Sequence, residues 1–73
     1  MEIVEIEEKQ RMRREEAADR LRAIADELSS GNSVRLEKGG LRFTARVPDE
    51  VVLKIEFEFE EDSAEFEIEL TWP

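Results

Sequence analysis

Two stretches near the end of the chain decide its fold: residues 51–60 read VVLKIEFEFE and residues 64–72 read AEFEIELTW. In both stretches apolar residues alternate with mainly acidic ones. A period of two is typical of a β-strand that has one apolar and one polar face. The intervening residues 61–63, Glu-Asp-Ser, break the pattern and predict a turn. We therefore expect two antiparallel strands with a dry face and a wet face.

The preceding residues continue the same alternation. Residues 34–37 and 41–47 each alternate apolar with polar side chains, and a glycine pair at 39–40 lies between them. Such a pair suits a two-residue hairpin turn. Pro48 begins a second turn. Because short turns join neighbouring strands, we expect four consecutive strands to pair as a meander.

Residues 14–30 show the helical period instead. Gly31 follows them and is the expected left-handed stop. The start is weaker, since Arg13 and Arg14 stand where a serine or aspartate cap is preferred and their charge opposes the helix dipole. One stripe of the helix is apolar. It comprises Ala17, Ala18, Leu21, Ile24, Ala25 and Leu28.

The predicted architecture is an α+β fold of one domain over residues 1–73. Residues 2–8 predict a further strand, which we place beside the last strand so that the sheet stays antiparallel. The order is then β-α-β-β-β-β, with the amphipathic helix packed on one face of a mostly antiparallel sheet of about five strands. Trp72 has the parity of the dry face, so we expect it in the core beneath the helix, in preference to a binding role.

Composition limits the possible chemistry. The 73 residues include no cysteine and no histidine, which excludes disulfides, thiolate zinc sites and the commonest general base. Twenty acidic residues oppose eleven basic ones, for a formal net charge of −9. Such a charge repels phosphates and anionic lipid, so we expect neither nucleic acid nor membrane as partner.

The start of the chain has no basic region followed by a long apolar run, so we expect no signal peptide and a cytoplasmic location. Acid excess with only three lysines favours a protein that works in concentrated salt, where ions screen self-repulsion. A basic partner protein is the alternative explanation.

The acidic residues of the last two strands form a stripe. A calcium site would need loop oxygens that a flat sheet lacks, and paired carboxylates would need a cleft to act on sugars. We interpret the stripe as a solvated face shared with Arg35, Arg42 and Arg46, which can pair with its carboxylates. The stripe comprises Glu56, Glu58, Glu60, Glu65, Glu67 and Glu69.

A basic cluster, Lys9, Arg11, Arg13 and Arg14, precedes and opens the helix. Helix N-terminal amides beside arginines can hold an anion, and the cluster could also contact an acidic partner. The alternative is that these side chains pair with the chain's own carboxylates, which we favour.

The sequence resembles the amphi-Trp domain family, short proteins of halophilic archaea and some bacteria. The resemblance spans nearly the whole chain. It is carried by the helix run from Arg14 to Leu28 and by residues 67–72, EIELTW, which end in Trp72. Similar sequences tend to carry a serine at the position of Arg13. The resemblance implies no activity, and it favours the high-salt interpretation of the charge.

No residue is predicted to be catalytic, to bind a cofactor or to ligate a metal. We expect a non-enzymatic protein-interaction or oligomerisation module adapted to high salt, with an unidentified protein as partner. A second copy of the chain is one candidate, because Val52 is a lone apolar residue on the polar sheet face and an edge strand can pair with another. The alternative is a small-ligand or anion-binding protein that uses the basic cluster.

Overall fold

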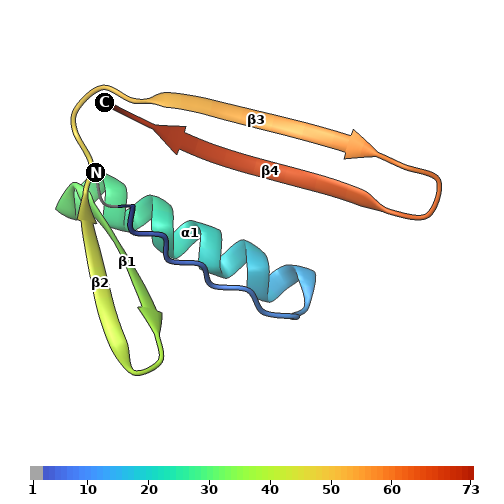
Figure 1. Cartoon of the computed structure of the whole chain (residues 1–73), viewed down its shortest axis with the longest axis horizontal. Coiled ribbons are helices and arrows are strands. Elements are labelled where there is room, and N and C mark those ends of the chain that lie inside the picture. The colour runs from blue at the N-terminus through green and yellow to red at the C-terminus, as the bar shows by residue number, and fades with distance from the viewer. Residues whose placement is uncertain (1–2) are drawn as a thin grey trace.

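The computed structural model describes residues 3–73, and within them it contains one helix and four strands (Figure 1). The α+β class and the order of these five elements agree with the prediction. The helix is α1 (Arg14–Gly31), and the strands are β1 (Ser33–Lys38), β2 (Leu41–Arg46), β3 (Val52–Phe59) and β4 (Ala64–Thr71).

Helix α1 begins where the sequence predicts. Arg13 is its extended N-cap and makes no side-chain capping hydrogen bond, which confirms the weak start. Glu15 lies in the first turn, where the helix dipole favours a negative charge. The predicted stop is wrong by one residue: Gly31 is still helical, and Asn32 adopts the left-handed conformation with φ 54°. Asparagine tolerates this conformation better than most residues, so it can end the helix.

Strands β1 and β2 form a hairpin on which α1 packs. Gly39 and Gly40 have φ of 60° and 78°, as a tight turn with two left-handed residues requires. This confirms the predicted turn. Apolar side chains of α1 and of this hairpin are half-buried together. They include Ile24, Leu28, Val34, Leu36 and Phe43.

Strands β3 and β4 form the second predicted hairpin, and the register separates its two faces. Ile55 lies opposite Ile68, and Phe57 lies opposite Phe66. The intervening acidic residues project to the other side, because successive side chains of a strand alternate between its faces.

The predicted single sheet is wrong. The two hairpins are separate two-stranded sheets, and β2 does not pair with β3. The connection from Val47 to Val51 has no regular structure and bends at Asp49, and Pro48 lacks a backbone N–H for a ladder. The backbone N–H of Val47 donates a hydrogen bond to the carbonyl of Asn32 at 2.9 Å. This bond holds the connection at the end of α1, away from a turn that would bring β3 back onto β2.

The strand expected over residues 2–8 is also wrong for residues 3–8; residue 2 lies outside the described residues. Residues 3–8 have no regular structure and run alongside α1 (Figure 1). A carboxylate oxygen of Glu8 lies 3.6 Å from the guanidinium of Arg20. The apolar residues Ile3 and Val4 are adjacent and therefore do not alternate as a half-buried strand would.

Within residues 3–73 no side chain is fully buried. Neither β3 nor β4 packs on α1, and Trp72 is 39% exposed, so its predicted place beneath the helix is wrong. The chain exposes 7219 Å², against about 4,700 Å² for a compact protein of this mass. Its radius of gyration is 14.1 Å, against about 11 Å for a compact chain. One chain thus leaves much apolar surface in water.

Candidate functional site

The most prominent feature of the surface is the apolar face of the β3–β4 hairpin. Phe57 is 62% exposed and Phe59 is 76% exposed. The ring of Phe57 stacks on Phe66, with centroids 4.5 Å apart, and on Phe59 at 5.7 Å. The face consists of six large side chains, each more than two-fifths exposed: Leu53, Ile55, Phe57, Phe59, Phe66 and Ile68.

Monomeric proteins rarely expose a contiguous apolar surface of this kind, and where one occurs it usually marks an interaction site. Aromatic side chains, phenylalanine among them, are also enriched at the centres of protein interfaces. The alternation in the sequence had predicted this face, but as the interior of a sheet. The alternation does not show whether the surface that covers this face belongs to the same chain or to another molecule.

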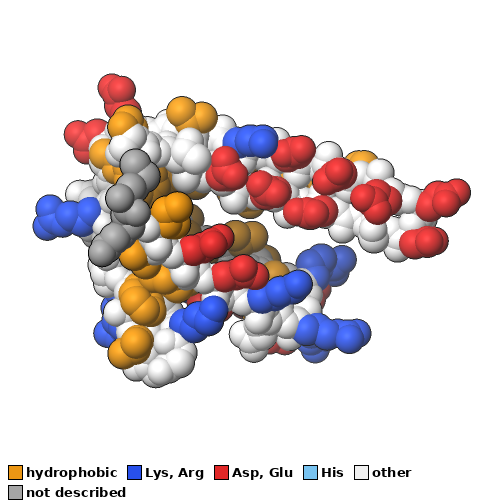
Figure 2. Space-filling view, in the orientation of Figure 1, with side chains coloured by type: hydrophobic (Ala, Val, Ile, Leu, Met, Phe, Trp, Pro, Cys, Tyr) orange, Lys and Arg blue, Asp and Glu red, His pale blue; other side chains and the backbone are white. Residues whose placement is uncertain are grey.

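The opposite face of the hairpin carries the predicted acidic stripe, which Figure 2 shows as a row of acidic side chains. Glu56 lies opposite Glu67, and Glu58 lies opposite Glu65. Like charges at such positions destabilise a sheet. Lys54 is the basic residue of this face, and its ammonium lies 3.0 Å from a carboxylate oxygen of Glu56.

Two pKa values on this face record the crowding of negative charge. The hydrogen bond and charge of Glu56, together with the charges of Glu69 and Glu67, raise the pKa of Lys54. Partial desolvation raises the pKa of Glu67, and the carboxylates of Glu69, Glu56 and Glu65 raise it further. Folding therefore brings acidic groups together against their repulsion.

The charge of the chain is concentrated in its last third. Residues 49–73 contain ten acidic residues and one lysine, a formal net charge of −9, which equals that of the whole chain. Residues 1–48 contain ten acidic and ten basic residues and are neutral overall. The hairpin is thus a strongly acidic arm attached to a neutral unit.

The predicted basic cluster lies on the extended segment before α1 and on its first residue, and all four side chains are exposed. The guanidinium of Arg14 lies 2.8 Å from Glu15 and lowers the pKa of that carboxyl. Within residues 3–73, Lys9, Arg11 and Arg13 form no ion pair. Pairing with the chain's own carboxylates, the interpretation we favoured, therefore holds for Arg14 alone.

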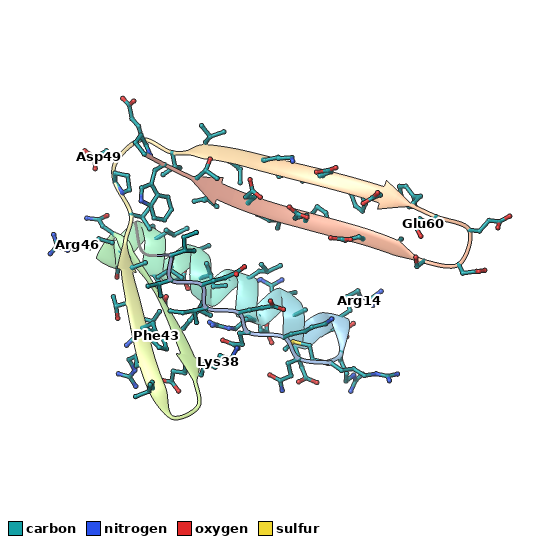
Figure 3. The ribbon with its side chains drawn as sticks, in the orientation of Figure 1. Arg14, Lys38, Phe43, Arg46, Asp49 and Glu60 are labelled. Carbon is teal, nitrogen blue, oxygen red and sulfur yellow. The ribbon has the colours of Figure 1, made fainter. Side chains whose placement is uncertain are left out.

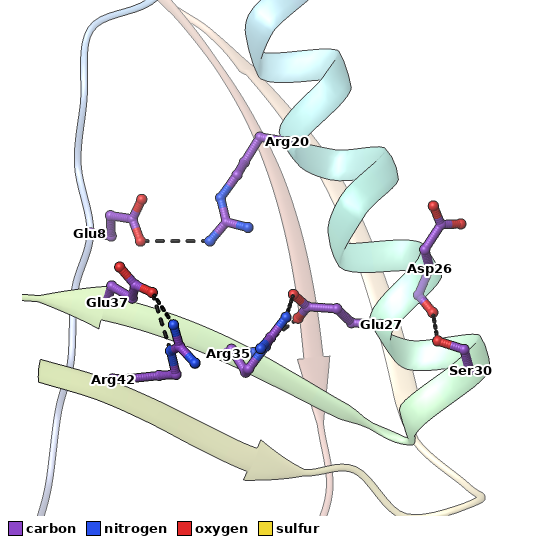
Figure 4. A network of polar contacts seen from close by, with 8 residues as sticks. All are labelled: Glu8, Arg20, Asp26, Glu27, Ser30, Arg35, Glu37 and Arg42. Carbon is purple, nitrogen blue, oxygen red and sulfur yellow. Dashed lines mark hydrogen bonds and ion pairs between the residues drawn. The ribbon is translucent and has the colours of Figure 1, made fainter.

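A second polar cluster was not predicted (Figure 4). Contrary to expectation, Arg35 does not lie on the acidic stripe, because its strand, β1, belongs to the other sheet. Its backbone N–H donates to Glu27 at 3.0 Å. Arg42 lies 3.1 Å from Glu37, and Arg46 also lies in β2, away from the stripe. The cluster lines a depression of about 300 Å³ and consists of Glu8, Arg20, Glu27, Arg35, Glu37 and Arg42.

Three arginines balance three glutamates in this cluster. The pairs join the N-terminal segment to α1 and α1 to β1, since Arg20 contacts Glu8 and Arg35 contacts Glu27. The arrangement ties three segments together and leaves no net charge to attract a ligand. This polar cluster could have been predicted only by knowing which strands share a sheet.

Beside this cluster lies a mainly apolar depression of about 360 Å³ between the N-terminal segment, α1 and β1. Glu8, Gln10 and Arg20 are its polar lining residues. The helix stripe supplies much of its apolar wall, and Leu21 in that wall is 47% exposed. The apolar residues are Met12, Ala17, Leu21, Ile24 and Leu36.

Trp72 follows β4 at the base of the hairpin. With Val51, Val52 and Pro73 it lines an open depression of about 420 Å³. Val52 is 65% exposed and lies opposite Thr71, which confirms its place on the polar face.

Residues 3–73 contain neither a metal-binding cluster nor a membrane-spanning helix. No group of three or more acidic residues is arranged to hold a metal ion. No helix in this range has the length and apolar character needed to cross a membrane.

These elements define a small α+β protein built from one amphipathic helix and two β-hairpins. The family model of the Amphi-Trp domain matches residues 1–73, so the chain belongs to the Amphi-Trp domain family. No curated protein and no solved structure matches the chain.

Proposed function

We propose that the chain is a non-enzymatic protein-binding module that binds a protein surface through the apolar face of β3–β4. The observation that carries this proposal is the exposure of six large apolar side chains on one face of a hairpin that packs on no other element. Such a face is stabilised when a partner removes it from water, at about 25 cal/mol per Å² of apolar area.

The charge pattern supports a module adapted to concentrated salt. Opposed glutamates such as Glu58 and Glu65 repel each other across the hairpin. Salt screens this repulsion but leaves apolar association intact. High salt therefore favours binding through the opposite, apolar face of the hairpin. A cytoplasm rich in salt is the compartment that we propose.

Anion binding by the basic cluster is the second candidate. It is supported by three exposed side chains without an ion pair among residues 3–73, Lys9, Arg11 and Arg13, beside a helix N-terminus. These residues lie along one extended segment, so they do not enclose a ligand. We therefore rank this function below protein binding.

Light scattering on the full chain in concentrated KCl tests the proposal. We expect a mass above that of the monomer, and we expect Phe57→Asp to abolish association because it places a charge within the apolar face. Glu58→Gln is the matched control: it neutralises the adjacent residue on the opposite face and should leave association unchanged. Oxidative footprinting of Phe57 in the same samples reports whether the face is covered. A monomer in which Phe57 is protected would contradict the proposal, since the chain would then cover its own hairpin.

A further inference from the structure

We infer that the partner is a second copy of this chain and that the two chains exchange hairpins: the apolar face of β3–β4 of each chain covers the depression between α1 and β1 of the other. This inference rests on the proposed function and names the occupant of the binding face.

Each chain presents two complementary surfaces that it does not cover itself. One is the apolar face of a two-stranded sheet, and the other is the apolar stripe of a helix, where Leu21 is 47% exposed. Helix on sheet is a standard way to bury both. The two surfaces also match in length: eight residues of β3 span about 27 Å and eighteen residues of α1 span about 27 Å.

The depression suits an aromatic side chain. Its volume of about 360 Å³ and its apolar wall can accept a phenylalanine ring from the hairpin. Phe57 and Phe66 are already stacked in the free chain, so little side-chain freedom remains to be lost on binding. A preorganised aromatic pair that enters an apolar pocket is typical of the centre of a stable interface.

The exposed area of one chain is large enough to form the interface of an obligate dimer. The chain exposes 7219 Å², about 2,500 Å² more than a compact protein of its mass. Two chains that each covered this excess would bury about 5,000 Å², within the range of permanent dimers. A symmetric exchange covers both excess surfaces at once, because each chain gives a hairpin and receives one.

Charge favours exchange over the stacking of two hairpins. Stacked hairpins would bring two segments of net charge −9 together. Exchange brings the hairpin to a neutral unit instead. Figure 3 shows Arg14 and Glu60 toward the same end of the molecule. A hairpin that lies along the partner's α1 in this same direction brings its acidic tip to the partner's basic cluster. The turn at the tip carries Glu60, Glu61 and Asp62.

The connection between the hairpins favours a partner over the chain's own helix. Pro48 restricts the backbone of residue 47 to extended conformations. The hydrogen bond from Val47 to Asn32 holds the same residue against the end of α1. Packing the hairpin on its own helix requires a different backbone course over residues 48–51, whereas an exchanged dimer can keep the connection as it stands.

Disulfide trapping tests the inference, because the chain has no cysteine of its own. One chain carries Ala64→Cys on the apolar face near the hairpin tip, and a second chain with a mass tag carries Ala17→Cys in the depression at the start of α1. The two are unfolded together, refolded in concentrated KCl and oxidised. We expect the mixed disulfide as the main product. Ala23→Cys, on the polar side of the same helix, is the matched control in place of Ala17→Cys and should give little mixed product.

The other outcomes overturn the inference in distinguishable ways. If Ala64→Cys forms mainly disulfides with itself, two hairpins stack on each other; the exchange is then wrong, while the proposed binding face stands. If a chain with both substitutions forms its disulfide internally at monomer mass, the hairpin covers its own helix and both proposals fail. A chain that stays monomeric and forms no disulfide overturns the exchange alone, since the apolar face then remains free to bind a different protein.

Discussion

The rings of Phe57 and Phe66 stack across the β3–β4 pair with centroids 4.5 Å apart and planes inclined by 8°. They do so on a hairpin that no other element of the chain supports. A hairpin alone in water is marginally stable, so this cross-strand contact is an important part of what holds the apolar face together.

Removal of either ring should therefore weaken the hairpin, and the two losses should not add. A double-mutant cycle of Phe57→Ala and Phe66→Ala should show a coupling of about 0.5–1.5 kcal/mol, the value typical of an aromatic pair. Denaturant unfolding at a fixed protein concentration, followed by the fluorescence of Trp72, measures it. Leu41→Ala in the other hairpin is the control partner and should be additive with Phe57→Ala. Additivity within the aromatic pair would show that the stacking contributes nothing.

Stability should rise with salt. Between about 0.1 M and about 1 M KCl the screening length falls from about 10 Å to about 3 Å, so the repulsion between opposed glutamates largely disappears. We expect a clear increase in melting temperature over this range. Glu58→Gln and Glu67→Gln should reproduce part of it in low salt. Glu5→Gln removes the same charge outside the hairpin and should have a smaller effect. A constant melting temperature would contradict the proposed adaptation to salt.

The pKa of Glu67 predicts a dependence on pH. Because its pKa is raised above the ordinary value of 4.5, the folded hairpin binds its proton more tightly than the unfolded chain does. The resulting stabilisation is complete below the unfolded pKa and is lost as pH rises through the folded pKa. The melting temperature should therefore increase as pH is lowered from neutral toward about 5.

Glu67→Gln provides the control for this effect, since it removes the titrating group and should flatten the curve. Glu15 has the opposite effect on stability. Arg14 lowers its pKa, so the stabilisation that ionised Glu15 gives the folded state is lost as pH falls through its folded pKa, below 4.5. The two effects thus occupy different ranges of pH. An unchanged slope in Glu67→Gln would assign the dependence to other carboxylates.

The uncapped start of α1 offers a stabilising substitution. Arg13→Ser would supply a side-chain oxygen to the first turn and remove a positive charge from the helix N-terminus, for a gain of about 1 kcal/mol. In a chain of this size the gain corresponds to about 4–8 °C in melting temperature, measured by circular dichroism. Arg11→Ser makes the same change of charge two residues earlier, where no cap can form, and should give a much smaller increase. Equal increases would show that charge alone is responsible.

The sequence was sufficient to predict the individual elements. All four strands and α1 lie within one or two residues of the positions predicted from periodicity, and the glycine turn between β1 and β2 has the expected backbone. The opposed acidic pairs follow from the same alternation. Local patterns determine these features because each depends on residues that are close in the chain.

The assembly of the elements could not be predicted in the same way. The alternation of side chains along the strand correctly placed Phe57 on an apolar face. It does not specify which surface covers that face. Trp72 shows the same limit: it has the parity of the apolar face, yet it follows the end of β4 and is partly exposed. The pairing of Arg35 with Glu27 joins a strand to a helix across a tertiary contact, so no spacing in the sequence reveals it.

The absence of a buried side chain among residues 3–73 has a consequence for the abundance of the protein. When apolar burial depends on association, the concentration of the chain enters the folding equilibrium directly. Each tenfold increase in concentration then favours the assembled state by about 1.4 kcal/mol. A cell that makes less of this protein would keep a smaller fraction of it folded, and dilution alone, without heat, acid or denaturant, would be enough to unfold it.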